Sequence, residues 1–414
     1  MKLSANMDRR LISATKMSER YLRVQITAPD RSTSGTRLPL NLALVIDRSG
    51  SMSGSKLEKA KEAAIVCLRN LTGADRTAIV AYDDEVRVVS PSQVLTPEAK
   101  NQMIAEVRAI YSGGSTNLGG GWLTGAQEVA NHQHEANYLS RAILLSDGLA
   151  NVGIVDTEEL AHHASQLRER GVGTTTMGIG ADFNEELLEK MAIKGGGHFY
   201  FIEQAAQIPD FLHRELGEVL STCARRVSLE LDLPEGAGAT LLNSFEVERG
   251  RCLRVRLDDM IAGEVRSLIF KLDVQPGSVG AALPIPLRLS YLDVDSGETL
   301  TVSSEEAVLT YASKMDCTAE APDAGVLEEA ALLQAAVARE EALRYDAEGR
   351  YAMSSASLAS AAAHLRMAAP ASPAAMAEAM SLEAESNEAT GGFTARKRKL
   401  LHYDQSARRQ SREK

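Results

Sequence analysis

The sequence predicts a chain that combines a doubly wound α/β domain, an antiparallel β-sandwich and a C-terminal helical region. Between residues 40 and 220, short β-branched apolar runs alternate with segments whose apolar residues recur at helical spacing. From residue 225 apolar and polar residues alternate, and from Pro322 the chain becomes rich in Ala, Leu and Glu. These changes divide the 414 residues into more than one domain, as expected for a length that exceeds what one hydrophobic core usually supports.

We expect the α/β domain to span residues 38–222. Its central strands are apolar on both faces and are placed at 40–46, 76–82, 141–146, 171–180 and 198–202. Helical segments separate these strands, so the pattern predicts a mostly parallel sheet covered by helices on both faces. The segment 86–90 follows its neighbour after only three residues, too few for a crossover helix, and is therefore predicted to be an antiparallel edge strand.

The segment 223–315 is predicted to form the β-sandwich, because its short alternating runs are separated by turns rich in Pro, Gly and Asp. The N-terminal segment 1–37 contains "YLRVQITAP" at 21–29, which has the same alternation but precedes the α/β domain. We expect this segment to contribute a strand to the sandwich. The α/β domain would then be an insertion between two parts of one β domain.

The segment 322–388 is predicted to form a helical hairpin or bundle, in which two helices meet at 348–350 and a third follows a Pro-rich stretch. The first two helices resemble one tetratricopeptide-like hairpin, but packing against the sandwich is favoured because no self-similar repeat adjoins them. The segment 389–414 carries eight Lys or Arg against Asp404 and Glu413. We predict that it is a disordered, solvated tail, with contact to a partner or an anionic surface as the alternative.

The composition excludes several classes of function. The net charge of -11 disfavours a general nucleic-acid binder, because neutralising phosphates requires a basic face. The four cysteines lie far apart without metal-binding spacing, which argues against a zinc site and a disulfide framework. No apolar run reaches the roughly 18 residues that cross a bilayer, and the N-terminus has no signal-peptide pattern, so we expect a cytoplasmic protein without a membrane span.

Polar residues occupy three loops that are expected at the carboxyl ends of the strands, where the loops of a doubly wound sheet line the ligand crevice. The first loop is "DRSGS", the second "GGSTN" and the third "SDG". Two ionised carboxylates about 4 Å apart repel by about 4 kcal/mol at an effective dielectric of about 20, so they need a proton or a cation. The candidate metal ligands are Asp47, Ser49, Ser51, Thr116 and Asp147.

The chemistry of these ligands selects the kind of metal. Oxygen donors without Cys or His suit a hard divalent ion, and Mg²⁺ accepts carboxylates, hydroxyls and retained waters in an octahedron. Glycines in the same loops would let the backbone turn tightly enough to converge on one ion. They are Gly50, Gly113, Gly114 and Gly148.

The stretch "DRSGSMSGSK" resembles the DxSxS signature of von Willebrand factor A domains, and "GGSTN" and "LLSDGLANVG" resemble the family's second and third metal loops in the same chain order. The resemblance covers about residues 40–220. Intracellular bacterial members and the inter-alpha-trypsin inhibitor heavy chains are the most similar in local sequence. The resemblance implies a Rossmann-like fold and a metal-ion-dependent adhesion site made by the five candidate ligands. It would hold Mg²⁺ or Mn²⁺, with Ca²⁺ as an alternative.

The resemblance also implies metal-mediated binding rather than catalysis. One coordination position would remain for an acidic group of a partner, so the first hypothesis is a non-enzymatic scaffold protein that grips an Asp or Glu carboxylate. The alternative is an adaptor subunit of an AAA+ ATPase of the MoxR type or of a chelatase complex. A metal-dependent hydrolase is less favoured, because it needs a general base and no histidine adjoins the three loops. The nearest, His132, His134, His162 and His163, are predicted to be solvated helix residues.

The first loop does not fit the motif of a phosphate-binding loop or of an aspartyl phosphatase. A phosphate-binding loop starting at Gly50 would need Gly at Ser55 and Ser or Thr at Leu57. An aspartyl phosphatase would need a second acid at Ser49. A simple helix cap accounts for the first loop but not for the three loops together.

Three nearby features are expected to have structural roles. Trp122 is expected in the α/β core, with a place at the rim of the metal site as the alternative. Lys56 is expected to be a solvated helix lysine, with contact to a partner carboxylate as the alternative. The residues 83–85 are predicted to form a hairpin turn without a functional role.

Overall fold

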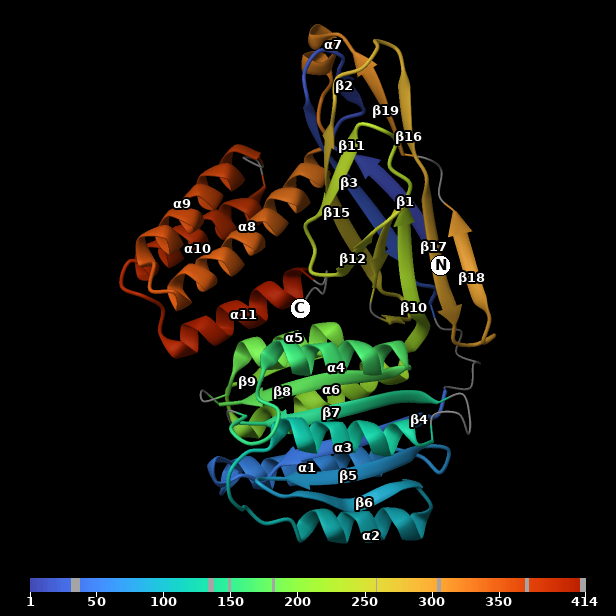
Figure 1. The fold of residues 1–414 in the computed structure, drawn as a ribbon, viewed down its shortest axis with the longest axis vertical. Helices are drawn as coiled ribbons and strands as arrows, with labels where there is room; N and C mark the ends of the chain where they lie inside the picture. Colours follow the sequence, from blue (N-terminus) through green and yellow to red (C-terminus); the bar gives the residue numbers. More distant parts are fainter. Residues whose placement is uncertain are drawn as a thin grey trace. The chain divides into compact units, whose positions relative to one another are not determined.

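The computed structural model describes residues 1–30, 38–132, 138–147, 150–180, 183–257, 259–303, 307–368 and 372–409. The chain divides into two compact units (Figure 1). One comprises Arg31–Thr222, and the other comprises Met1–Asp30 together with Cys223–Lys414. The chain therefore starts in the second unit, leaves it for the α/β unit and then returns.

The α/β unit is built on a six-stranded sheet with the order β6-β5-β4-β7-β8-β9. All neighbouring strands are parallel except β5 and β6, which are antiparallel, so the predictions of a mostly parallel sheet and an antiparallel edge strand are confirmed. Every residue of β4 is buried, as expected for a central strand covered on both faces. The strands are β4 (Leu40–Asp47), β5 (Arg76–Tyr82), β6 (Val86–Val94), β7 (Leu139–Ser146), β8 (Val172–Ile179) and β9 (Gly196–Ile202).

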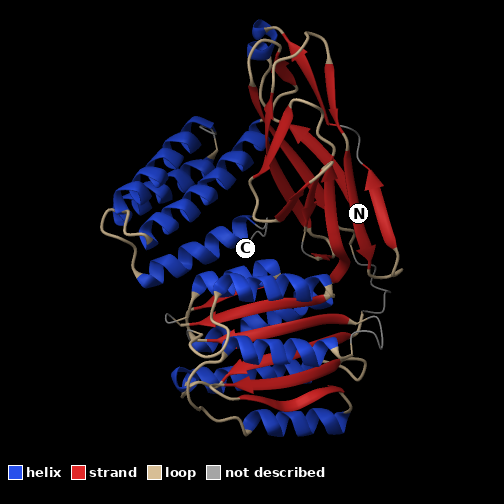
Figure 2. Cartoon of the chain, in the orientation of Figure 1, coloured by secondary structure: helices blue, strands red, loops and turns tan. Residues whose placement is uncertain are grey.

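Helices pack on this sheet (Figure 2) and bury apolar residues at three- and four-residue spacing, as Leu57, Ala60 and Ala64 do in α1. Helix α3 lies unusually close to the strands. A Cβ atom at Gly121 would lie 2.4 Å from the Tyr82 ring, and one at Gly125 would lie 2.3 Å from Val45. The helices are α1 (Ser55–Asn70), α2 (Pro97–Arg108), α3 (Leu118–Ala130), α4 (Thr157–Glu169), α5 (Glu185–Lys194) and α6 (Ile208–Leu220).

The second unit contains a four-stranded sheet of order β1-β3-β15-β11, a sheet of order β12-β13-β10-β17-β18 to which β14 adds, and a small sheet of order β16-β19-β2. Apolar side chains from all three sheets share one buried core. The first segment of the chain contributes three strands rather than the one expected, and β3 pairs with β15 along its whole length.

The strands of this unit are short, apart from three of ten residues each. They are β1 (Lys2–Met7), β2 (Leu11–Ser13), β3 (Ser18–Thr27), β10 (Thr222–Leu231), β11 (Ala237–Leu241), β12 (Glu246–Arg249), β13 (Leu253–Arg256), β14 (Met260–Ile261), β15 (Val265–Val274), β16 (Ala282–Ile285), β17 (Leu287–Asp293), β18 (Thr299–Ser303) and β19 (Ala307–Ala312).

The helical region follows the sandwich. Helices α8 and α9 meet at 348–350, as the sequence predicts, and Gly349 provides the positive φ of +71° that this tight connection uses. The helices are α7 (Lys314–Ala319), α8 (Ala324–Ala347), α9 (Tyr351–Ala368), α10 (Pro373–Ala389) and α11 (Ala395–Arg409).

Helix α11 corrects the prediction of a disordered basic tail. Leu401 is buried in the core that α8, α9 and α10 share, which anchors the helix. Its cations pair with acidic residues of α8 and α10: Arg398 with Asp346 at 3.2 Å, and Lys397 with Glu385 at 3.8 Å. The positive charge therefore has partners within the chain. Residues 410–414 of the predicted tail lie outside the described part.

In the described part of the chain, none of the helices combines the length and the apolarity needed to cross a bilayer.

Candidate metal centre

The first and third predicted metal loops meet at one edge of the sheet. Strands β4 and β7 are adjacent and parallel, so Asp47 at the end of β4 and Asp147 just after β7 lie at the same edge. The Ser51 hydroxyl donates to Asp147 Oδ1 at 2.8 Å, and the Ser49 and Ser51 hydroxyl oxygens are 3.1 Å apart. Both carboxylates are fully buried. The structure thus brings two carboxylates and two hydroxyls together.

Asp47 is held by donors on both carboxylate oxygens. Oδ1 accepts the Ser49 backbone N–H at 2.8 Å, and Oδ2 accepts the Ser146 hydroxyl at 2.7 Å and the Tyr82 hydroxyl at 3.4 Å. Burial raises the pKa of Asp47 above its usual value despite these hydrogen bonds, and the charge of Asp147 raises it further. The ionised site is therefore short of positive charge.

The second loop, which carries Thr116, is attached to the first by backbone hydrogen bonds. The Gly50 N–H donates to Gly114 O at 2.9 Å, and the Gly113 N–H donates to Arg48 O at 2.7 Å. The Thr116 N–H donates to the Asn151 side chain at 2.9 Å, which links this loop to the chain that follows Asp147. Thr116 is itself buried, at 4% exposed. All five predicted ligands therefore lie on connected loops.

Asp83 has a structural role that was not predicted, because the sequence analysis placed it in a simple hairpin turn. Its Oδ1 pairs with Arg48 at 2.9 Å, and its Oδ2 accepts the Gly114 N–H at 3.1 Å. A Cβ atom at Gly113 would lie 1.7 Å from Asp83 Oδ2, so the glycine is what allows the second loop to lie on this carboxylate. Asp83 therefore positions the first and second loops. The signal available in the sequence was its place directly after a strand, like Asp47 and Asp147.

Lys56 also differs from its prediction as a solvated helix lysine. Its ammonium pairs with Asp147 Oδ2, and the side chain is only 27% exposed. Ser51 and Lys56 together therefore engage both oxygens of Asp147. The lysine supplies one positive charge to a site with two carboxylates.

The remaining predictions concern residues around the site. Trp122 is fully buried and its Nε1–H donates to the Thr174 hydroxyl at 3.3 Å, which places it in the core rather than at the rim. His132 contacts Arg76, and His162 and His163 lie on α4. His134 and Gly148 lie outside the described residues.

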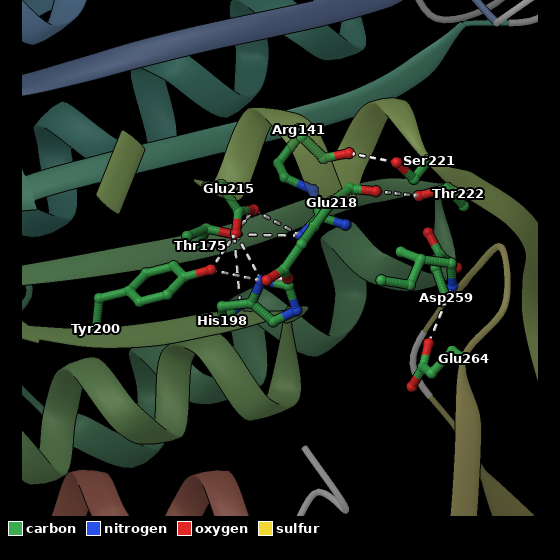
Figure 3. Close-up of polar contacts among 12 residues, drawn as sticks. Arg141, Thr175, His198, Tyr200, Glu215, Glu218, Ser221, Thr222, Asp259 and Glu264 are labelled. Carbon is green, nitrogen blue, oxygen red and sulfur yellow. Dashed lines mark hydrogen bonds and ion pairs between the residues drawn. The ribbon is translucent and has the colours of Figure 1, made fainter. Parts of the chain in front are cut away.

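A second polar cluster lies between β9 and α6 (Figure 3), and sequence reasoning did not identify it. Among the described residues, His198, Glu215 and Glu218 are the one group of three or more His, Cys, Asp or Glu side chains that lie close enough to share a metal. However, Glu215 already accepts the Thr175 hydroxyl at 2.6 Å and pairs with Arg141 at 3.2 Å. The Arg141 guanidinium already supplies a positive charge beside Glu215. We therefore interpret this cluster as an ion-pair network that attaches α6 to the sheet.

Comparison with known proteins agrees with this fold. Residues 41–214 match the model of the von Willebrand factor type A domain. YfbK, an uncharacterized protein of Escherichia coli K12, is 30% identical over 61% of this chain and 44% of its own length. Heavy chain 4 of the mouse inter alpha-trypsin inhibitor is 30% identical over 44% of this chain and 20% of its own length. The chain thus spans less than half the length of both relatives.

The fold of the whole chain also has a solved counterpart. A von Willebrand factor type A protein from Catenulispora acidiphila matches with a TM-score of 0.70 and 20% identity, over 93% of this chain and 96% of that one. At this level of identity the likeness concerns the fold. It extends over both units of this chain, well beyond residues 41–214.

Proposed function

We propose, from the premise that residues 41–214 form a von Willebrand factor type A domain, that this protein binds a divalent cation and grips an acidic group of a partner through it. The ligands would be the five residues of the three loops: Asp47, Ser49, Ser51, Thr116 and Asp147. The observation that carries the proposal is the meeting of two buried carboxylates with two hydroxyls at one sheet edge.

The donor set fits a hard cation. Every proposed ligand offers oxygen, which suits Mg²⁺ or Mn²⁺ and, with more ligands, Ca²⁺. Burial raises the pKa of Asp47, and repulsion from the Asp147 carboxylate adds to this shift. A divalent ion would remove this repulsion and neutralise both charges.

The site supports binding rather than turnover. Five protein groups leave one position of an octahedral ion for an outside oxygen. A partner carboxylate suits that position because two aspartates only balance the ion's charge. Of the described histidines closest in sequence to the loops, His132 contacts Arg76, and His162 and His163 lie on α4. We therefore propose a non-enzymatic scaffold protein. Its cytoplasmic location stays a prediction.

The first test is metal binding by the purified protein. We expect isothermal titration with Mg²⁺ or Mn²⁺ to detect binding by the wild type and none by Asp47→Ala. The variant should melt at or above the temperature of the metal-free wild type, because it loses one of two repelling carboxylates. Asp232→Ala, which removes an exposed carboxylate from the other unit, is the matched control. Wild-type metal affinity in Asp47→Ala would mean that the site is misassigned.

The second test is capture of the partner from native lysate. Binding should disappear with EDTA and return with Mg²⁺ or Mn²⁺. Capture of an AAA+ ATPase would identify the protein as an adaptor of that machine. Capture that is indifferent to EDTA would exclude a metal bridge.

A further inference from the structure

Lys56 occupies a place that is unusual for a helix lysine. It is the second residue of α1, five positions after Ser51, and its ammonium contacts Asp147 Oδ2 while Ser51 holds Oδ1. We propose that Lys56 is an internal cation of the metal centre. It neutralises Asp147 until a divalent ion displaces it, and it thereby sets the metal affinity. This inference rests on the proposed function of the same site.

The charges explain why the ammonium is held there and why it can be displaced. Asp47 and Asp147 are both fully buried, and an unpaired ionised carboxylate is strongly disfavoured in such a place. One ammonium offsets only one of the two negative charges. A divalent ion offsets both and contacts both carboxylates, so it competes successfully, but only after Lys56 has left Asp147.

The geometry allows the lysine, and not the aspartate, to move. Asp147 has no exposed surface, whereas 27% of the Lys56 side chain is exposed, so its ammonium can reach water by rotating about its own side-chain bonds. Gly180, which directly follows β8, lies beside the lysine: a Cβ atom there would be 3.5 Å from the Lys56 ammonium nitrogen, an ordinary van der Waals contact. The exchange thus needs no change in the backbone.

The affinity test compares Lys56→Met with the wild type. Methionine keeps an unbranched side chain and removes the charge, so Mn²⁺ should bind about tenfold more tightly in isothermal titration, within the range of coupling between two competing ligands. In EDTA the same variant should melt below the wild type, because Asp147 has lost its cation. Lys56→Arg keeps the positive charge, so its Mn²⁺ affinity and its melting temperature in EDTA should stay close to those of the wild type. Lys59→Met, one turn along α1 and paired with Glu62, is the matched control and should change neither property.

A direct test follows Lys56 in the unmodified protein. Acetylation by an amine-reactive ester, quantified by mass spectrometry, should label Lys56 faster in Mn²⁺ than in EDTA, because the metal releases the amine from Asp147. Lys59 serves as the internal reference. This readout remains decisive if Lys56→Met fails to fold.

The outcomes separate this inference from the function on which it rests. If the wild type binds no Mn²⁺, both fail. If the wild type binds Mn²⁺ but Lys56→Met has the same affinity, or the labelling rate of Lys56 does not change with metal, then only the role of Lys56 is overturned.

Discussion

The α/β unit contains two buried clusters of charged residues that differ in how far their carboxylates are balanced by positive charge. Around Glu215, each carboxylate oxygen has donors, and Arg141 and His198 lie against it at 3.2 and 2.5 Å. At the metal centre, Asp47 and Asp147 are both fully buried, and one partly exposed ammonium, that of Lys56, pairs with Asp147. The first cluster is complete without a ligand, whereas the second is short of positive charge. Burial of acids therefore indicates a binding site only where the chain itself does not balance them.

The sharpest way to test this difference is to remove Glu215. Glu215→Ala leaves Arg141 buried without its carboxylate, so the free energy of unfolding should fall by about 3–5 kcal/mol. Asp47→Ala should leave the free energy of unfolding of the metal-free protein unchanged or raise it. Urea unfolding of the two variants measures this. Glu186→Ala, which breaks an exposed pair with Lys190, should stay within about 0.5 kcal/mol of the wild type. Equal stability of Glu215→Ala and wild type would show that the Glu215 cluster is not structural.

A variant of Asp83 should affect stability and metal binding together. Asp83→Ala removes the bonds to Arg48 and Gly114, which should cost about 1–3 kcal/mol of unfolding free energy. Because the second metal loop then loses its support, the affinity for Mg²⁺ should fall by about tenfold. Urea unfolding and isothermal titration report the two effects. Asp232→Ala, which removes an exposed carboxylate from the other unit, is the control. Unchanged metal affinity in Asp83→Ala would refute its positioning role.

The smallest change concerns Thr116. Thr116→Ala keeps both carboxylates, so stability should change by less than about 1 kcal/mol and metal binding should weaken only modestly. Partner capture should weaken more, because in the proposed site the hydroxyl would help to orient the ion's open position. Thr116→Ser restores the hydroxyl and should restore capture. If capture is insensitive to both variants, Thr116 has no part in the interface.

The sheet of the α/β unit and the five candidate ligands could be predicted because their signals are local. An apolar run followed at once by Asp, Ser or Gly marks the end of a buried strand, and parallel strands place such ends at one edge. Asp47 and Asp147 needed no knowledge of distant contacts. Their role as metal ligands remains a prediction.

Several features could not be predicted because their causes lie far away in the sequence. Lys56 pairs with a residue 91 positions away. The partners of Glu215 come from three different strands, so no motif marks them. The basic segment suggested disorder by its composition, whereas Arg398 in fact pairs with Asp346 on another helix. Composition reports charge but not where the opposite charge lies.

The insertion of the α/β unit sets an order of events during synthesis of the chain. Strand β3 pairs with β15 (Figure 1), and Leu22 lies opposite Phe270 in this pair. That side of β3 therefore stays unpaired until β15 has been synthesised. By then the whole of Arg31–Thr222 has already been made and can fold as a unit. We therefore expect amides of β4 to be protected from hydrogen exchange in a nascent chain that ends after Thr222, while those of β3 are less protected because β15 has not been made. Until β15 has been made, β3 presents an unpaired edge, which exposes this third strand of the nascent chain to wrong pairing.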